Sequence, residues 1–193
     1  MQSGRRAKLI PHLPRALGIA RRYFVVNGFD GALTMLGLLT GFYFNEQTPL
    51  AVVIGACLGA AVALGISGLT SAYLSESAER QRALADLEEA MIADLSASTH
   101  GTASRLLPLV IALVNGAAPL SVSLLVISPL WLSQTGVPLP LDPLLSAIAA
   151  AFLCIFGLGI FLGSIGGIFW LWSGVKAVLV ALVTVAIIFL IGS

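Results

Sequence analysis

The chain has 193 residues, of which 58% are hydrophobic and only 10% are charged, and its formal net charge is +1. Soluble domains carry about 25% charged residues, so this composition excludes an ordinary soluble protein and indicates an integral membrane protein. The sequence also has no P-loop, no H-E-x-x-H and no Cys-His cluster, and we therefore do not expect an enzyme. The two cysteines, Cys57 and Cys154, both lie within apolar runs, where cysteine is typically a small buried hydrophobe.

Residues 1–22 form a basic segment at the start of the chain. Its cations before the first apolar run include Arg5, Arg6, Lys8 and Arg15. This pattern, with prolines between apolar residues, is typical of a segment held at a membrane surface by anionic lipid headgroups. Beyond its charge, nothing in the segment indicates nucleic-acid binding, so we expect membrane lipids as partners and no nucleic acid.

Apolar runs near the ~20 residues that a helix needs to cross a bilayer occupy most of the remaining chain. We place five of them at about 23–44, 50–75, 106–132, 144–169 and 174–192. The sequence therefore predicts an all-α, polytopic membrane protein with five transmembrane helices. The first two helices lie in 23–75 and the other three in 106–193, with a polar interval at 76–105 between them.

The distribution of lysine and arginine predicts the orientation of these helices. All of these residues lie in the N-terminal segment, in the polar interval or, as Lys176, at the start of the fifth run. With five spans these places share one side of the membrane, and the positive-inside rule makes that side the cytoplasm. We therefore expect the N-terminus in the cytoplasm and the C-terminus outside.

Four acidic residues in the polar interval share a spacing of 3, 7 and 3, which places them on one side of a helix. They are Glu76, Glu79, Asp86 and Glu89. We predict that the second transmembrane helix continues into the cytoplasm as an acid-striped helix and ends near 96–101. Glu79, Asp86 and Glu89 are then candidate ligands that capture a cation before it enters the membrane. The alternative is an ordinary solvated face, in which Arg82 pairs with Asp86 and Glu79.

Asp30 is an ionisable residue about 12 Å along a helix from Arg22, deep in the first apolar run. A carboxylate at such a depth costs at least ~2.5–3.5 kcal/mol unless it has a partner or a task. Other polar side chains at a similar predicted depth are Asn27, Ser67, Thr70, Ser71 and Asn115. Oxygen ligands of this kind suit hard or borderline divalent cations. Two alternatives are that the polar groups only hold helices together, and that Asp30 pairs with Lys176 within one subunit.

Several motifs occur in a recognisable order between about residues 20 and 192. The first apolar run reads Asn-Gly-Phe-Asp-Gly at 27–31, followed by glycines at 37 and 41. The second run ends with Ile-Ser at 66–67 and Tyr-Leu-Ser at 73–75, followed by Glu-Arg at 79–80. The third contains Gly-Ala-Ala-Pro-Leu at 116–120, and the fifth opens with Gly-Val-Lys at 174–176. Together these motifs resemble the vacuolar iron transporter family, whose first span typically reads G-x-x-D-G.

The resemblance implies a homodimer that exports Fe²⁺ or Mn²⁺ from the cytoplasm in exchange for protons, with the metal as substrate and no cofactor. The path lies between the two copies of the first span, where Asp30 matches the metal- and proton-carrying aspartate of the family. Met35 is a candidate soft ligand on the same span. The short polar interval resembles that of prokaryotic members, which implies a prokaryotic plasma membrane.

The chain departs from the family at two positions of the second span. The family usually has a methionine after the Ile-Ser pair and a glutamate before the tyrosine, whereas this chain has Gly68 and Ala72. Glu76, one turn beyond Ala72, is a candidate substitute for the glutamate. These departures define the alternative function, a non-transporting membrane scaffold or binding protein that keeps the family fold without the metal site. Gly31, together with the glycines at 37 and 41, is expected to let two copies of the first span approach closely.

Overall fold

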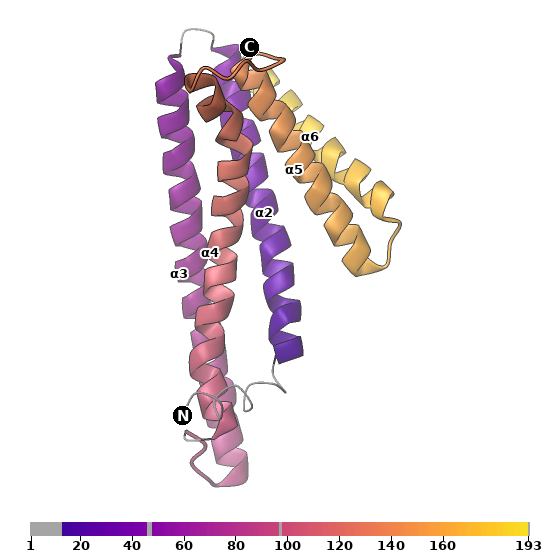
Figure 1. Ribbon diagram of the computed structural model, residues 1–193. Helices are drawn as coiled ribbons and strands as arrows, with labels where there is room; N and C mark the ends of the chain where they lie inside the picture. Colours follow the sequence, from indigo (N-terminus) through magenta and orange to yellow (C-terminus); the bar gives the residue numbers. More distant parts are fainter. Residues whose placement is uncertain (1–12, 46–47, 97, 193) are drawn as a thin grey trace.

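The computed structural model describes residues 13–45, 48–96 and 98–192, and five long helices account for nearly all of them (Figure 1). These helices are α2 (Leu13–Phe44), α3 (Leu50–Met91), α4 (Thr99–Gln134), α5 (Pro143–Gly166) and α6 (Trp170–Gly192). Within the described residues, each of the five contains a stretch that is long and apolar enough to cross a membrane. The predicted all-α class and the five spans are confirmed, and the chain is a multi-pass membrane protein.

Several helix boundaries differ from the predicted ones, most of all at the start of α2 and around the polar interval. Helix α2 begins at Leu13, ten residues before the predicted span, so part of the basic segment is helical. The predicted extension of the second span is confirmed, because α3 has 42 residues and continues to Met91. It ends earlier than predicted, where Ile92 adopts a left-handed conformation with φ 48°. Helix α4 begins at Thr99, so the polar interval is a hairpin made by the ends of α3 and α4.

Helices α2, α3 and α4 form one bundle, and α5 and α6 form a hairpin that leans away from it (Figure 1). Helices α2, α4 and α6 run in one direction and α3 and α5 in the other, so α2 and α4 are parallel. The hydrophobic core joins the bundle to the upper part of the hairpin. Its fully buried side chains include Met35, Leu36, Leu39, Ile127 and Ile155.

Glycines bring the helices of one subunit into backbone contact. A Cβ atom on Gly31 would lie 2.6 Å from the carbonyl oxygen of Pro119, and one on Gly116 would lie 2.6 Å from the carbonyl oxygen of Gly65. The expectation that Gly31 lies between two copies of the first span is therefore wrong, because α4 of the same subunit occupies that place. Gly37 faces Ile188 of α6. Gly41 is the one glycine of the set 31, 37 and 41 at which an added Cβ atom would meet nothing within 4 Å.

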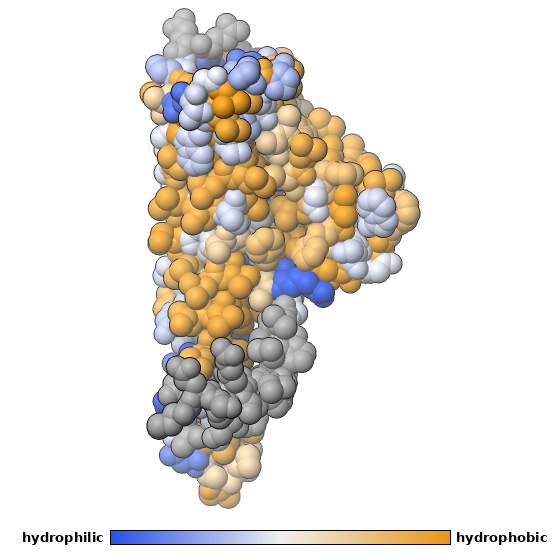
Figure 2. Space-filling view, viewed as in Figure 1, coloured by the Kyte–Doolittle hydropathy of each residue, from blue (hydrophilic) through white to orange (hydrophobic). Residues whose placement is uncertain are grey.

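The outer surface has the character of a protein embedded in lipid. Hydrophobic residues cover most of the middle of the face seen in Figure 2, over both the bundle and the hairpin. Hydrophilic residues gather at its upper end, and another hydrophilic cluster lies at the lower edge of the hydrophobic region. Large exposed apolar side chains such as Leu153, which is 72% exposed, belong to this surface. Soluble proteins seldom expose apolar patches of this extent, so the surface supports the assignment made from the helices.

Candidate functional site

Asp30 lies within the apolar part of α2, and its side chain is exposed on the outside of the subunit. Ala32 and Met35, on the opposite side of the helix, are fully buried in the core. Among the described residues, no hydrogen bond or ion pair involves the Asp30 carboxylate. The predicted alternative pairing with Lys176 is not formed, because that ammonium group lies over the ring of Trp172, 5.8 Å from its centroid. A single subunit therefore presents an uncompensated carboxylate at its apolar surface.

Asn27, one helical turn before Asp30, meets Asn115, in agreement with the predicted depths of the two asparagines. The side-chain amide of Asn27 donates to the Oδ1 atom of Asn115 at 2.5 Å and to the carbonyl oxygen of Tyr23 at 2.9 Å. Asn115 is buried, with 4% of its surface exposed, and its amide donates to the carbonyl oxygen of Gly68 at 2.6 Å. These bonds join α2, α4 and α3 at one depth. We call the polar side chains at this depth, Asn27, Asp30 and Asn115, the Asp30 layer.

The three hydroxyl groups predicted for this layer lie on the exposed side of α3. Ser67, Thr70 and Ser71 are all exposed. Ser71 donates a long hydrogen bond of 3.4 Å to the carbonyl oxygen of Gly68. In the described part of the chain no hydrogen bond joins any of the three hydroxyls to Asp30 or to the asparagines. The depth prediction was sound for the amides. The hydroxyls make no bond to them, although Ser71 and Asn115 share the carbonyl oxygen of Gly68 as their acceptor, because helix rotation, which depth does not specify, decides which side chains meet.

Met35 is not available as a soft ligand. It is fully buried among the apolar side chains of the core, five residues and about 140° around the helix from Asp30 at 100° per residue. The prediction that Met35 is a ligand was wrong, because the sequence of a helix that is apolar all round does not indicate which side faces the core. The candidate metal-ligating atoms near Asp30 are therefore oxygens and not sulfur.

Glu76 is buried on α3, with 6% of its surface exposed, and its Oε2 atom lies 3.3 Å from the Nε atom of Arg80. It lines a polar pocket of about 430 Å³ between the first turns of α2 and the middle of α3. Arg22 and Tyr23 face the same pocket, as does Glu79. Glu76 is eight residues from Gly68, or about 12 Å along the helix, so it does not lie in the layer of Asp30.

The acidic residues beyond Glu76 do not form a metal site in one subunit. Glu79, Asp86 and Glu89 are exposed on α3. In the described residues no group of three His, Cys, Asp or Glu side chains is arranged to hold a metal ion. The alternative pairing through Arg82 is not formed either, since Arg80–Glu76 is the ion pair that the described part of the chain contains. These carboxylates form a solvated acidic face.

Gly68 and Ala72 have a packing role that sequence reasoning missed. A Cβ atom on Gly68 would lie 3.1 Å from the backbone oxygen of Asn115, and Ala72 is 5% exposed. A methionine at Gly68 would press its Cβ atom against the backbone of α4, which would have to move by a few tenths of an ångström. The sequence does contain a signal for this packing. Gly65 and Gly68 lie on one helix and Gly116 lies on another, and small residues at such positions let helices approach closely.

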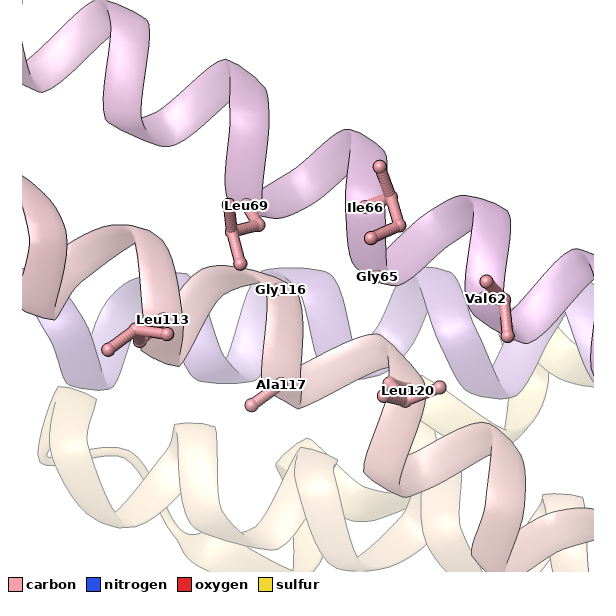
Figure 3. A pocket seen from close by; sticks show the side chains of 8 residues that line it. All are labelled: Val62, Gly65, Ile66, Leu69, Leu113, Gly116, Ala117 and Leu120. Atoms are coloured by element: carbon pink, nitrogen blue, oxygen red, sulfur yellow. The ribbon is translucent and has the colours of Figure 1, made fainter.

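The same crossing of α3 and α4 leaves an apolar groove of about 220 Å³ on the outer surface (Figure 3). Its lining consists of Val62, Gly65, Ile66, Leu69, Leu113, Gly116, Ala117 and Leu120. None of these side chains carries a charge or a polar group, so the groove offers nothing to a cation. The Asp30 layer and the pocket at Glu76 are the polar features that remain as candidates.

The fold and the Asp30 layer define a polytopic α-helical membrane protein with an unpaired carboxylate on the apolar surface of its first described helix. An uncharacterized protein of Methanocaldococcus jannaschii is 27% identical over 173 residues, which is 88% of this chain and 87% of that protein. No known family profile matches the chain, and no solved structure matches it. The likeness to the archaeal protein extends over nearly the whole fold, and its description names no activity.

Proposed function

We propose that the protein is a carrier, not an enzyme, that moves divalent iron or manganese out of the cytoplasm as a member of the vacuolar iron transporter family. The observation that carries this proposal is the exposed carboxylate of Asp30 in the middle of a membrane-length helix. A carboxylate facing lipid is costly, and such residues normally mark an ion or proton pathway. The metal is the substrate, and no cofactor takes part.

The proposed carrier is a homodimer whose path lies between two copies of α2. One carboxylate is too little for a divalent cation, whereas a two-fold axis beside α2 brings two carboxylates to the same path. Two carboxylates also match the charge of the ion. Because metal and proton compete for the same oxygens, protonation releases the metal and metal binding releases the proton. This competition supplies the coupling to a proton gradient.

The proposed orientation has the N-terminus in the cytoplasm and the C-terminus outside, in a prokaryotic plasma membrane. It rests on the lysine and arginine distribution, together with the alternating direction of the five helices. A membrane-impermeant thiol reagent applied to intact cells should label Thr135→Cys, beyond the end of α4, and should not label Ser96→Cys, before its start. The reverse pattern would contradict this orientation.

The second candidate function is a non-transporting membrane scaffold or binding protein. It is favoured by the absence, among the described residues, of any group of three metal-ligating side chains. It is also favoured by the packing roles of Gly68 and Ala72, where the family has ligands. For this protein Asp30 would serve contact with a partner, and replacing it would change assembly without changing any metal-dependent signal.

Transport by purified protein in proteoliposomes separates the two functions. We expect Mn²⁺ and Fe²⁺ uptake that depends on a pH gradient and that Asp30→Asn reduces to the level of empty vesicles. The matched control is Asp142→Asn, because Asp142 caps the start of α5 and asparagine caps a helix equally well. Metal flux that does not depend on the pH gradient, or that is unchanged in Asp30→Asn, would refute the proposed transport.

A further inference from the structure

Asn27 is held in one orientation by the groups around it. A side-chain amide has two N–H donors and one carbonyl acceptor. Both donors of Asn27 are used, one by the carbonyl oxygen of Tyr23 at 2.9 Å and the other by Oδ1 of Asn115 at 2.5 Å. Turning this amide over would set its oxygen against two acceptors. Its carbonyl oxygen therefore points away from both of these partners.

Asn115 owes its own orientation to α3. Its amide donates to the carbonyl oxygen of Gly68 at 2.6 Å, and a backbone carbonyl can only accept. Reversing Asn115 would bring two oxygens together at Gly68 and two amide groups together at Asn27. The donors consequently run in one direction, from Asn27 to Asn115 to Gly68. Because Asn115 is 4% exposed, water does not compete for these bonds.

The side-chain oxygen of Asn27 has no hydrogen-bond partner within the described residues. Asn27 is half-buried and lies three residues before the exposed Asp30 on the same helix. Side chains at this spacing are neighbours on a helix surface, with Cβ atoms about 5–6 Å apart. The free acceptor and the unpaired carboxylate therefore lie next to each other at the outer surface of α2.

We propose that the side-chain oxygen of Asn27 is a neutral ligand for the divalent cation beside Asp30, and that Asn115 is a positioning residue that keeps this oxygen turned toward the ion. This inference rests on the proposed function and names its ligands. Each subunit contributes one carboxylate and one amide oxygen, and the sulfur of Met35 lies in the core. An all-oxygen set of this kind suits Mn²⁺ better than softer metals.

The test is a double-mutant cycle on Mn²⁺ binding by the full-length protein in detergent. Asn27→Ala removes the ligand, and Asn115→Ala removes the group that orients it. Residues that orient a metal ligand typically contribute about 10–100-fold to metal affinity, so we expect each variant to raise the Kd for Mn²⁺ at least about tenfold. We expect the double variant to bind no more weakly than Asn27→Ala, because Asn115 acts through Asn27. Ser123→Ala, which removes another buried polar group from α4, is the matched control and should leave the Kd unchanged.

Each outcome of the cycle supports or refutes the inference. Losses that add in the double variant, or an Asn27→Ala variant with wild-type affinity, would refute it. If Asn115→Ala does not fold, Asn27→Ala decides alone, because a folded Asn27→Ala protein with wild-type affinity for Mn²⁺ refutes the ligand role of Asn27. Binding that is lost in Asp30→Asn but kept in Asn27→Ala refutes this inference alone. If the wild-type protein shows no Mn²⁺ binding that depends on Asp30, both the proposed function and this inference are refuted.

Discussion

Polar residues of the membrane interior take two different positions in this protein. Asn27 and Asn115 bond to each other between helices, whereas Asp30, one turn away, stays on the outer surface. Their common depth follows from the sequence, because a helix rises about 1.5 Å per residue from a boundary marked by charged residues. Their directions do not follow from it. A helix that is apolar all round has no polar face to mark its outer side.

Gly31 is the residue at which the packing of α2 on α4 can be tested. Its missing Cβ atom would lie 2.6 Å from the Pro119 carbonyl oxygen, a backbone atom that cannot move aside easily. We expect Gly31→Ala to destabilise the protein by about 1–3 kcal/mol through overpacking, measured by thermal unfolding in detergent. Gly41→Ala is the control, because a Cβ atom added there would meet nothing within 4 Å, and it should leave stability unchanged or raise it by up to about 1 kcal/mol. Equal shifts in the two melting temperatures would contradict this account of the contact.

Helix α3 changes its surroundings along its length. Glu76 is buried and lines a pocket together with residues of α2, whereas Glu79, Asp86 and Glu89 are exposed. Helical periodicity assigned all four carboxylates to one side, and it could not separate them because the cover comes from another helix. The end of α3 is stabilised locally instead. Ser96 donates hydrogen bonds from its side chain and backbone to Asp94, and these lower the pKa of that carboxyl group.

The exposed acidic face should raise the local concentration of cations without binding them tightly. We expect the triple variant Glu79→Gln, Asp86→Asn, Glu89→Gln to lower the rate of Mn²⁺ uptake about two- to tenfold at low salt, since a charged surface steers counter-ions toward it. In 1 M salt the Debye length is about 3 Å, so the variant and the wild type should become equal. Measured stability should change by less than about 0.5 kcal/mol, as for most surface substitutions. A deficit that persists in high salt would instead indicate a true binding site.

The whole subunit leaves one side of α2 uncovered. Helix α6 contacts α2 near Gly37 and Phe44. Toward the N-terminal end of α2, the hairpin of α5 and α6 leans away from the bundle (Figure 1). Asp30 and Val26 lie on the outer side of α2, and Val26 is 52% exposed. A symmetric partner placed against this surface would bring both Asp30 carboxylates together.

Cysteine cross-linking tests this arrangement. In a background without the two native cysteines, Val26→Cys should form a disulfide between subunits in membranes under mild oxidation. Val25→Cys is the neighbouring control, because Val25 is 1% exposed and faces the core, and it should stay monomeric on a non-reducing gel. A monomeric Val26→Cys protein, or equal cross-linking of both variants, would argue against a dimer formed through α2.

The sequence by itself determined that this is a five-span helical membrane protein, that the second helix extends beyond the bilayer, and that Asn27, Asp30 and Asn115 share a depth. Each of these features depends on hydropathy, length and rise per residue, which are properties of one helix at a time. Only the tertiary structure decided that Met35 belongs to the core, that Gly31 and Gly68 pack against α4, and that Asp30 faces outward. These features depend on the rotation of one apolar helix against another, which close packing between helices sets and hydropathy does not encode.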